Sequence, residues 1–188
     1  QRNNLLHCRG AVVVIAVWFS CGAASAAALK LTIEKHGVDQ VRAVNQTIKE
    51  EHSDNRRFLA DVADWCGIEI EQYTASKYPD ASCKTVWDKR KAMAFPMGAP
   101  CTVHLKKEAR QEWEALHFPK WHVLGFTAEE QKRHERFVAT ERENVLPILI
   151  DANMTKADCG DMIRSAGIDL PAIYSHGFPN ANCIGCVK

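Results

Sequence analysis

An uninterrupted apolar run near the start of the chain constrains the fold more than any other feature. Residues 11–19 read AVVVIAVWF and are rich in β-branched side chains. A strand with one solvent-facing side alternates apolar and polar residues, whereas this run predicts a strand buried on both faces of a parallel sheet. The small residues SCGAAS follow at 20–25, and an Ala-rich helix is expected through about Lys35, with Gly37 at its end. The chain therefore starts as an α/β protein.

The next segments repeat this alternation of strand and helix. Residues 40–48 predict a second strand, and Asp54 is placed to cap a helix that runs to Cys66 and stops at Gly67. Residues 68–74 alternate as a third strand. Strands at intervals of about thirty residues, separated by helices, are typical of right-handed βαβ units.

The second half of the chain supplies the remaining elements. Thr155 and Asp158 resemble a capping box at the start of a helix, and Pro171 begins an irregular, Cys-bearing tail. The sequence predicts a single doubly wound, mainly parallel five-stranded sheet with flanking helices. The expected helices lie at 83–94, 103–116, 127–142 and 156–166, and the expected strands at 121–126 and 145–150.

Charge and cysteine content narrow the class of protein. The formal net charge of +1 gives no global field that would recruit nucleic acid or a membrane, so any anion site must be local. The 8 cysteines do not indicate a secreted disulfide framework, because 46% of the residues are hydrophobic and can build a core. Reduced thiols in a cytoplasmic protein are the better interpretation, with some of them free to act as ligands.

One segment resembles a targeting signal. Residues 8–28 imitate a signal peptide, with Cys21 in a lipoprotein-like position, but the apolar part is too short to span a bilayer. We interpret 1–10 as an N-terminal extension and 11–188 as one domain. The chain has no initiating Met and stops abruptly after Lys188, which indicates that both ends are cuts from a longer gene product.

The loop at 20–25 is the first candidate site, because ligands of parallel sheets gather where the strands end. Small side chains let backbone N–H groups approach an anion, and the start of a helix adds positive charge. Ser20 and Ser25 can donate hydroxyl hydrogen bonds, and Gly22 is expected to supply room and unusual backbone angles. The loop matches neither the Walker pattern nor Gly-x-Gly-x-x-Gly. The alternative is that small residues only allow tight packing of helix on sheet.

Several segments, in order, resemble the phosphoadenosine phosphosulfate (PAPS) reductase-like family of the adenine nucleotide alpha-hydrolase-like (PP-loop) superfamily. SCGAAS is similar to the pyrophosphate loop Ser-Gly-Gly-x-Asp-Ser, with Cys21 at the first Gly and Ala24 at the Asp. SCGAAS and the final NCIGCVK are closest to phage-borne members. The other matching segments are APCTVHLKK (99–107), VLGFTAEEQKRHERF (123–137), PILIDANMTKADCGDMIRSAGIDLP (147–171) and IYSHGFPNANCIGC (173–186).

The resemblance implies a site for an adenine nucleotide, either PAPS or ATP, together with Mg²⁺. Because the family's acidic residue helps to position metal-bound phosphates, Ala24 in its place argues against cleavage of ATP. Lys107, Arg136, His52, Asp54 and His176 are weaker candidates, and a solvated charged face is the alternative for the basic ones. The implied nucleotide-binding residues are Ser20, Cys21, Gly22, Ala23, Ala24, Ser25, Asn45, Lys106 and Arg133.

The resemblance also implies a metal held by cysteines. Cys183 and Cys186 would join Cys101, with Cys83 as the first choice and Cys159 as the second choice for a fourth ligand. Four thiolates suit Zn²⁺ and a [4Fe–4S] cluster equally well. Two alternatives remain: free cysteines often act as small buried apolar residues, and a Cys-x-x-Cys can be a redox pair.

Three functions follow as hypotheses. The first is thiol-dependent reduction of a nucleotide sulfate to sulfite, with a thiol donor such as thioredoxin. The family's nucleophilic cysteine lies on a tail beyond the Tyr–Gly region, so no catalytic residue is assigned and the 188-residue chain alone is expected not to reduce PAPS. The second is ATP-dependent sulfur transfer to a nucleic acid base, and the third is a non-catalytic nucleotide- and metal-binding module.

Overall fold

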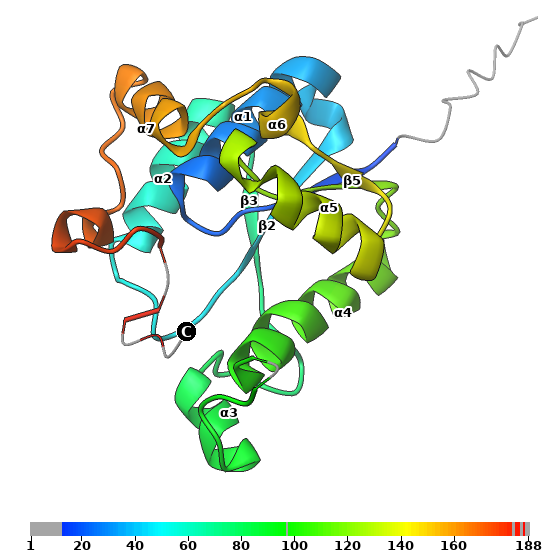
Figure 1. The fold of residues 1–188 in the computed structure, drawn as a ribbon, viewed down its shortest axis with the longest axis vertical. Helices are drawn as coiled ribbons and strands as arrows, with labels where there is room; N and C mark the ends of the chain where they lie inside the picture. Colours follow the sequence, from blue (N-terminus) through cyan, green and yellow to red (C-terminus); the bar gives the residue numbers. More distant parts are fainter. Residues whose placement is uncertain (1–12, 97, 182, 185, 187–188) are drawn as a thin grey trace, which may run out of the picture.

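The computed structural model describes residues 13–186 except 97, 182 and 185, and its fold is drawn in Figure 1. Five strands form one sheet in the order β3-β2-β1-β4-β5, and every neighbouring pair is parallel. The predicted doubly wound α/β sheet is therefore confirmed. The strands are β1 (Ile15–Trp18), β2 (Val41–Gln46), β3 (Ile70–Tyr73), β4 (Trp121–Val123) and β5 (Val145–Leu146).

Helices cover both faces of the sheet. Side chains of β1 alternate between two cores: Ile15 and Val17 face the helices α1, α2, α6 and α7, whereas Trp18 packs on Trp113 of α4. This two-sided burial explains why the β1 sequence has no polar face. The helices are α1 (Ala23–His36), α2 (Asn55–Cys66), α4 (Glu108–His117), α5 (Gln131–Thr140), α6 (Ile148–Asp151) and α7 (Lys156–Ser165).

A small lobe with its own core lies beyond the carboxyl end of the sheet. It contains α3 (Cys83–Arg90), at the bottom of Figure 1, and the π-helical segment η2 (Thr102–Lys107) that leads into α4. Its buried residues are Ile48, Tyr78, Cys83, Val86 and Leu105, with Cys101 and Cys183 packed against them. The tail pairs with the loop after β2 through a bridge between Glu51 and Cys183.

Most helix ends follow the local sequence signals. Gly37 and Gly67 end α1 and α2 with positive φ, and Gly67 adopts the left-handed conformation. The Thr155 hydroxyl accepts a hydrogen bond from the Asp158 N–H, which confirms the predicted capping box. Asp54 precedes α2 but makes no side-chain cap, so its predicted capping role is wrong.

Several predicted elements differ from the structure. The helix expected at 83–94 ends at Arg90, and the strand expected at 121–126 ends at Val123. The strand expected at 145–150 ends at Leu146, because Pro147 has no N–H to extend the ladder and α6 follows it. The tail after Pro171 is not wholly irregular, since Ala172–His176 form the 3-10 helix η4. Among the helices of the described part of the chain, none combines the length and the apolar character needed to cross a membrane.

Candidate functional site

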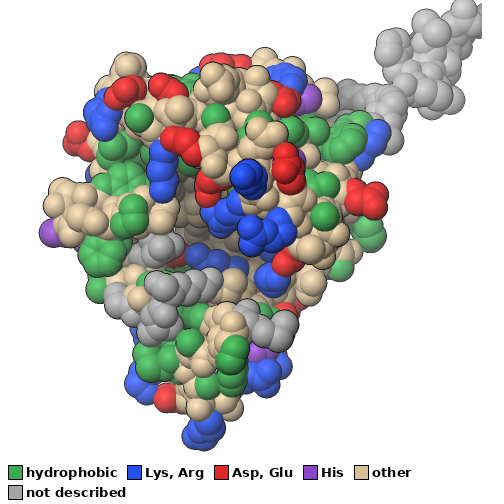
Figure 2. All heavy atoms as spheres, in the orientation of Figure 1, with side chains coloured by type: hydrophobic (Ala, Val, Ile, Leu, Met, Phe, Trp, Pro, Cys, Tyr) green, Lys and Arg blue, Asp and Glu red, His purple; other side chains and the backbone are tan. Residues whose placement is uncertain are grey.

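The site lies where the direction of the sheet's winding reverses. The chain moves from β1 to β2 on one side and later from β4 to β5 on the other. The loops after β1 and β4 therefore separate at the carboxyl ends of the strands, where ligands of such sheets bind. Figure 2 shows a hollow in this face of the molecule, between the tail on one side and α4 and α5 on the other, with Lys and Arg side chains on its wall.

The loop after β1 is folded around the hydroxyl of Ser25. This hydroxyl oxygen accepts hydrogen bonds from the N–H groups of Ser20 at 3.1 Å and Gly22 at 3.3 Å, and donates to the Gly22 carbonyl at 2.8 Å. Cys21 is the residue with positive φ, at 56°, whereas Gly22 has an ordinary φ of −107°. The expectation that Gly22 supplies unusual backbone angles is therefore wrong; its role is to leave space.

The tail covers the start of α1. The Tyr174 hydroxyl accepts a hydrogen bond from the Ala23 N–H at 3.1 Å. A β-carbon on Gly22 would lie 3.2 Å from this hydroxyl oxygen, closer than most side-chain contacts. The hydrogen bond from Ala23 favours the ionised phenol, but burial outweighs it and raises the pKa of Tyr174. One of the backbone N–H groups at the start of α1, that of Ala23, is therefore already hydrogen-bonded within the protein.

Gly125, just after β4, is a site residue that the sequence reasoning missed. A β-carbon there would lie 2.9 Å from the Ala24 carbonyl carbon and 2.9 Å from the Ser25 nitrogen. Since these atoms belong to backbone, no side chain can move away to make room. The only sequence signal is a glycine within the strand predicted at 121–126, which can mark a close approach of another backbone.

Two predicted site residues, Asn45 and Cys21, point into the protein. The Asn45 amide donates to the Phe19 carbonyl at 2.9 Å and lies 3.5 Å from the Cys21 sulfur. Burial raises the pKa of Cys21 to about 12, so its thiol is neutral at physiological pH. Both residues support the loop from beneath.

Lys106, a predicted nucleotide-binding residue, lies near Cys21 of the loop. Its ammonium is 3.5 Å from a carboxylate oxygen of Glu51, whose side chain is only 8% exposed. The Glu51 carboxylate also accepts a hydrogen bond from Asn55 at 3.2 Å. Burial raises the pKa of Glu51, and the charge of Lys106 opposes this rise. Both charged groups act on the Cys21 thiol, which places them close to the loop.

Two other predicted cations form ion pairs with carboxylates. Arg133 is exposed, pairs with Glu130 and lies over the Phe126 ring at 5.3 Å from the centroid. Lys107 pairs with Glu141, which directly follows α5. Arg136, a weaker candidate, is exposed. Two further weaker candidates, His52 and His176, lie together, with their ring centroids 5.9 Å apart.

Asp54 belongs to a clasp that holds the tail. Its carboxylate accepts two hydrogen bonds from Arg57, at 2.7 and 2.9 Å, and one from the Ala172 N–H at 2.8 Å. Arg57 also donates to the Asp169 and Leu170 carbonyls. The clasp therefore fixes the segment that leads into η4, which carries Tyr174.

Arg110 on α4 is a further cation that the sequence reasoning did not single out. Its guanidinium lies over the Trp18 ring at 5.7 Å and the Phe137 ring at 5.9 Å. Within the described part of the chain it makes no hydrogen bond and no ion pair. Burial and the nearby positive charge of Arg142 lower the pKa of Arg110. Trp18 is the last residue of β1, which leads into the loop, and the carboxylates of Glu114 and Glu141 partly oppose the lowering of the Arg110 pKa.

Three of the four predicted metal ligands come together. The Cys83 and Cys183 sulfurs are 4.0 Å apart, and the Cys83 thiol also interacts with Cys101. Cys186 is exposed, and its N–H donates to the Cys183 carbonyl at 3.1 Å. The second-choice ligand, Cys159, is buried in the separate core beneath α1.

The described side chains contain no group of three or more His, Cys, Asp or Glu residues arranged to hold a metal ion. The four-thiolate site therefore stays a prediction. The pKa of Cys183 is lowered by its hydrogen bond with Cys83 and by the charge of Lys106, although burial opposes both effects. The pKa of Cys83 is raised by its contacts with Cys101 and Cys183.

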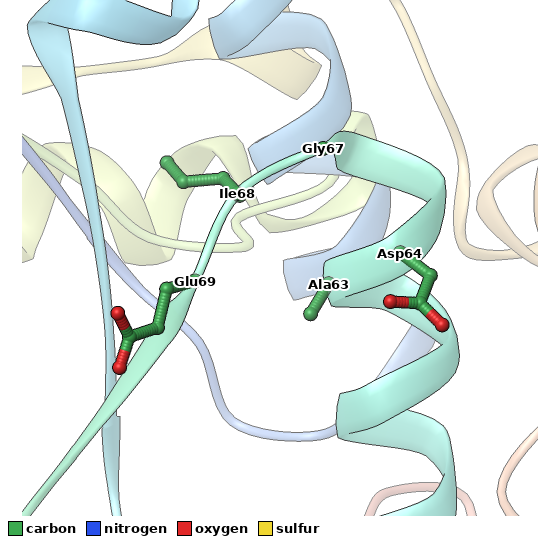
Figure 3. Close-up of a pocket in the computed structure, with 5 residues that line it drawn as sticks. All are labelled: Ala63, Asp64, Gly67, Ile68 and Glu69. Carbon is green, nitrogen blue, oxygen red and sulfur yellow. The ribbon is translucent and has the colours of Figure 1, made fainter.

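A shallow pocket lies elsewhere on the protein. Figure 3 shows its lining at the end of α2 and the start of the segment leading to β3: Ala63, Asp64, Gly67, Ile68 and Glu69. Because these residues precede β3, the pocket lies at the amino ends of the strands, at the edge of the sheet opposite the site.

Comparison with known proteins identifies the fold. No protein family model matches the chain, and no curated protein matches its sequence. Among solved structures, the chain is similar to phosphoadenylyl-sulfate (PAPS) reductase from Candida auris in a phosphate complex, with a TM-score of 0.64 and 10% sequence identity. The similarity covers 91% of this chain and 81% of that chain. The protein therefore has a PAPS reductase-like α/β fold.

Proposed function

We propose that this protein binds an adenine nucleotide at the carboxyl ends of its strands and acts in sulfur chemistry as a PAPS reductase-like protein. One observation carries the proposal: a loop of small residues, folded around Ser25, opens α1 at the switch point of a sheet with this fold. Backbone N–H groups at such a helix start favour phosphate. Lys106, whose charge acts on Cys21 of the loop, and Arg110, which lies over the ring of Trp18 at the end of β1, add positive charge.

The ligand that we favour is a nucleotide sulfate rather than ATP. The first turn of α1 contains no acidic side chain that could help to hold a metal-bound triphosphate. In the proposed reaction a thiol attacks the sulfur of the sulfate, the nucleotide leaves, and a second thiol releases sulfite while a disulfide forms. The two thiols together supply the two electrons, with a thiol donor such as thioredoxin as their source.

Calorimetric titration with PAPS and ATP tests the binding site. The variant Gly22→Val should lose nucleotide binding, because its branched side chain fills the space between the loop and the Tyr174 hydroxyl. Gly160→Ala on α7 is the control, since a β-carbon there meets only the movable end of Arg164, at 3.4 Å. Unchanged affinity in a folded Gly22→Val protein, judged by circular dichroism, would remove the loop from the site.

Product analysis on the full-length gene product tests the reaction. Sulfite formed from PAPS with a thiol donor supports reduction. AMP and pyrophosphate formed from ATP would instead support sulfur transfer to a nucleic acid base. Nucleotide binding without either product would reduce the proposal to a binding module.

A further inference from the structure

We propose that Cys83 and Cys183 are a redox-active thiol pair that forms a reversible disulfide and fastens the tail to α3. Both are free cysteines, with sulfurs 4.0 Å apart, although 100 positions separate them in the chain. A disulfide requires a sulfur–sulfur distance of about 2.05 Å, so the two sulfurs must approach by about 2 Å to form the bond. The proposal does not depend on the nucleotide function.

Glu50 holds both partners in place before any bond forms. Its carboxylate accepts hydrogen bonds from the Cys83 N–H at 2.8 Å and from the Ser82 hydroxyl at 2.6 Å. Its carbonyl accepts a hydrogen bond from the Ile184 N–H at 2.9 Å, next to Cys183. Because one residue binds the backbone on both sides, the short distance between the sulfurs is built into the fold.

The two thiols differ in access, which sets the order of the reaction. Cys83 is 1% exposed, whereas Cys183 is half-buried. A small disulfide reagent therefore reaches Cys183 first. Cys83 lies directly behind it and can resolve the adduct.

The oxidant that we propose is a low-molecular-weight disulfide such as oxidised glutathione. The Cys183 thiolate attacks one sulfur of the reagent, releases one small thiol and becomes a mixed disulfide. The Cys83 thiolate then attacks the Cys183 sulfur, releases the second small thiol and forms the protein disulfide. Two protein thiols are oxidised, one small disulfide is reduced to two thiols, and reduction by excess small thiol reverses both steps.

Mass spectrometry after alkylation of free thiols tests the pair in the full chain, purified under anaerobic conditions and exposed to oxidised glutathione. We expect a peptide linked between Cys83 and Cys183, released by dithiothreitol. Cys83→Ser should retain glutathione on Cys183, because the resolving thiol is missing, and Cys183→Ser should lose the linked peptide. Cys101→Ser and the buried control Cys66→Ser should still form it.

A thermal scan and one further variant give a second readout. Closing a loop of this length should raise Tm by about 5–10 °C in the oxidised wild-type protein. Glu50→Gln keeps every thiol but weakens the hydrogen bond from the Cys83 N–H to the side chain of residue 50. Formation of the Cys83–Cys183 disulfide should therefore slow by about tenfold. A Cys83–Cys101 or Cys183–Cys186 link, a stable glutathione adduct on wild type, or a metal held by both thiols after purification would overturn the proposal.

Discussion

The Tyr174 hydroxyl oxygen lies 3.1 Å from the Ala23 backbone nitrogen and joins the tail to the start of α1 across 151 positions of the chain. Tyr174→Phe removes this acceptor and should lower the free energy of unfolding by about 1 kcal/mol. Urea unfolding measures the difference. Tyr73→Phe is the control, because the Tyr73 hydroxyl makes no hydrogen bond to any described residue. An equal effect of both substitutions would mean that the Ala23 contact contributes nothing.

Gly125→Ala should destabilise the protein, because the added β-carbon meets the backbone of Ala24 and Ser25 at 2.9 Å. Overpacking of this kind costs about 1–3 kcal/mol, and the displaced loop should also weaken nucleotide binding. Gly160→Ala lies inside α7 with room for a methyl group and should instead stabilise by up to about 1 kcal/mol. Thermal melts of the two variants should shift in opposite directions, and equal shifts would contradict the close approach.

The clasp at Asp54 predicts a loss of stability in acid. Its hydrogen bonds with Arg57 lower the pKa of Asp54 from 3.8 to about 2. The carboxylate therefore stabilises the fold fully above pH 3.8, and the contribution disappears as the pH falls through about 2. Allowing for solvent screening, its size is on the order of 1 kcal/mol.

Asp54→Asn tests this contribution directly. The variant should be less stable than wild type at pH 7, and the two proteins should converge as the pH falls from 4 toward about 2. Denaturant unfolding at several pH values gives the comparison. A difference that is constant over this window would show that the charge of Asp54 is not the cause.

Arg110→Gln tests the cation that lies over the ring of Trp18, the last residue of the strand before the loop. If the guanidinium binds an anionic group of the nucleotide, its loss should weaken binding by about tenfold, or ~1.4 kcal/mol. Arg42→Gln is a matched control, because Arg42 also lies over a Trp ring, that of Trp113, but already pairs with Glu71 at 3.0 Å. Calorimetry should separate the two variants, and equal affinities would assign Arg110 a packing role.

The sequence predicted the sheet because its signals are local. The apolar run at 11–19, the glycines that end α1 and α2, and the capping box at Thr155 each act within one element. The error at 145–150 arose because an apolar segment does not distinguish a strand from a buried helix, and Pro147 decides between them.

The site was less predictable because its key contacts are distant in sequence. No pattern near Asp54 indicates that its carboxylate binds Arg57 and the tail instead of capping α2. The roles of Gly125 and Arg110 depend on which loops and rings the fold brings next to them. Proximity of Cys83 to Cys183 was expected only through the predicted metal site, which no observation tests.

The position of β1 has a consequence for how the protein is made. It is the first of the five strands in the chain, yet it lies in the centre of the sheet, and one of its edges pairs with β4 at Trp121–Val123. During synthesis on the ribosome, that edge stays without its partner until about 100 more residues have been added, which takes on the order of 10 s. An apolar strand with an open edge readily pairs with other chains. We therefore expect the yield of folded protein to depend on chaperone supply more than the stability of the finished fold would indicate.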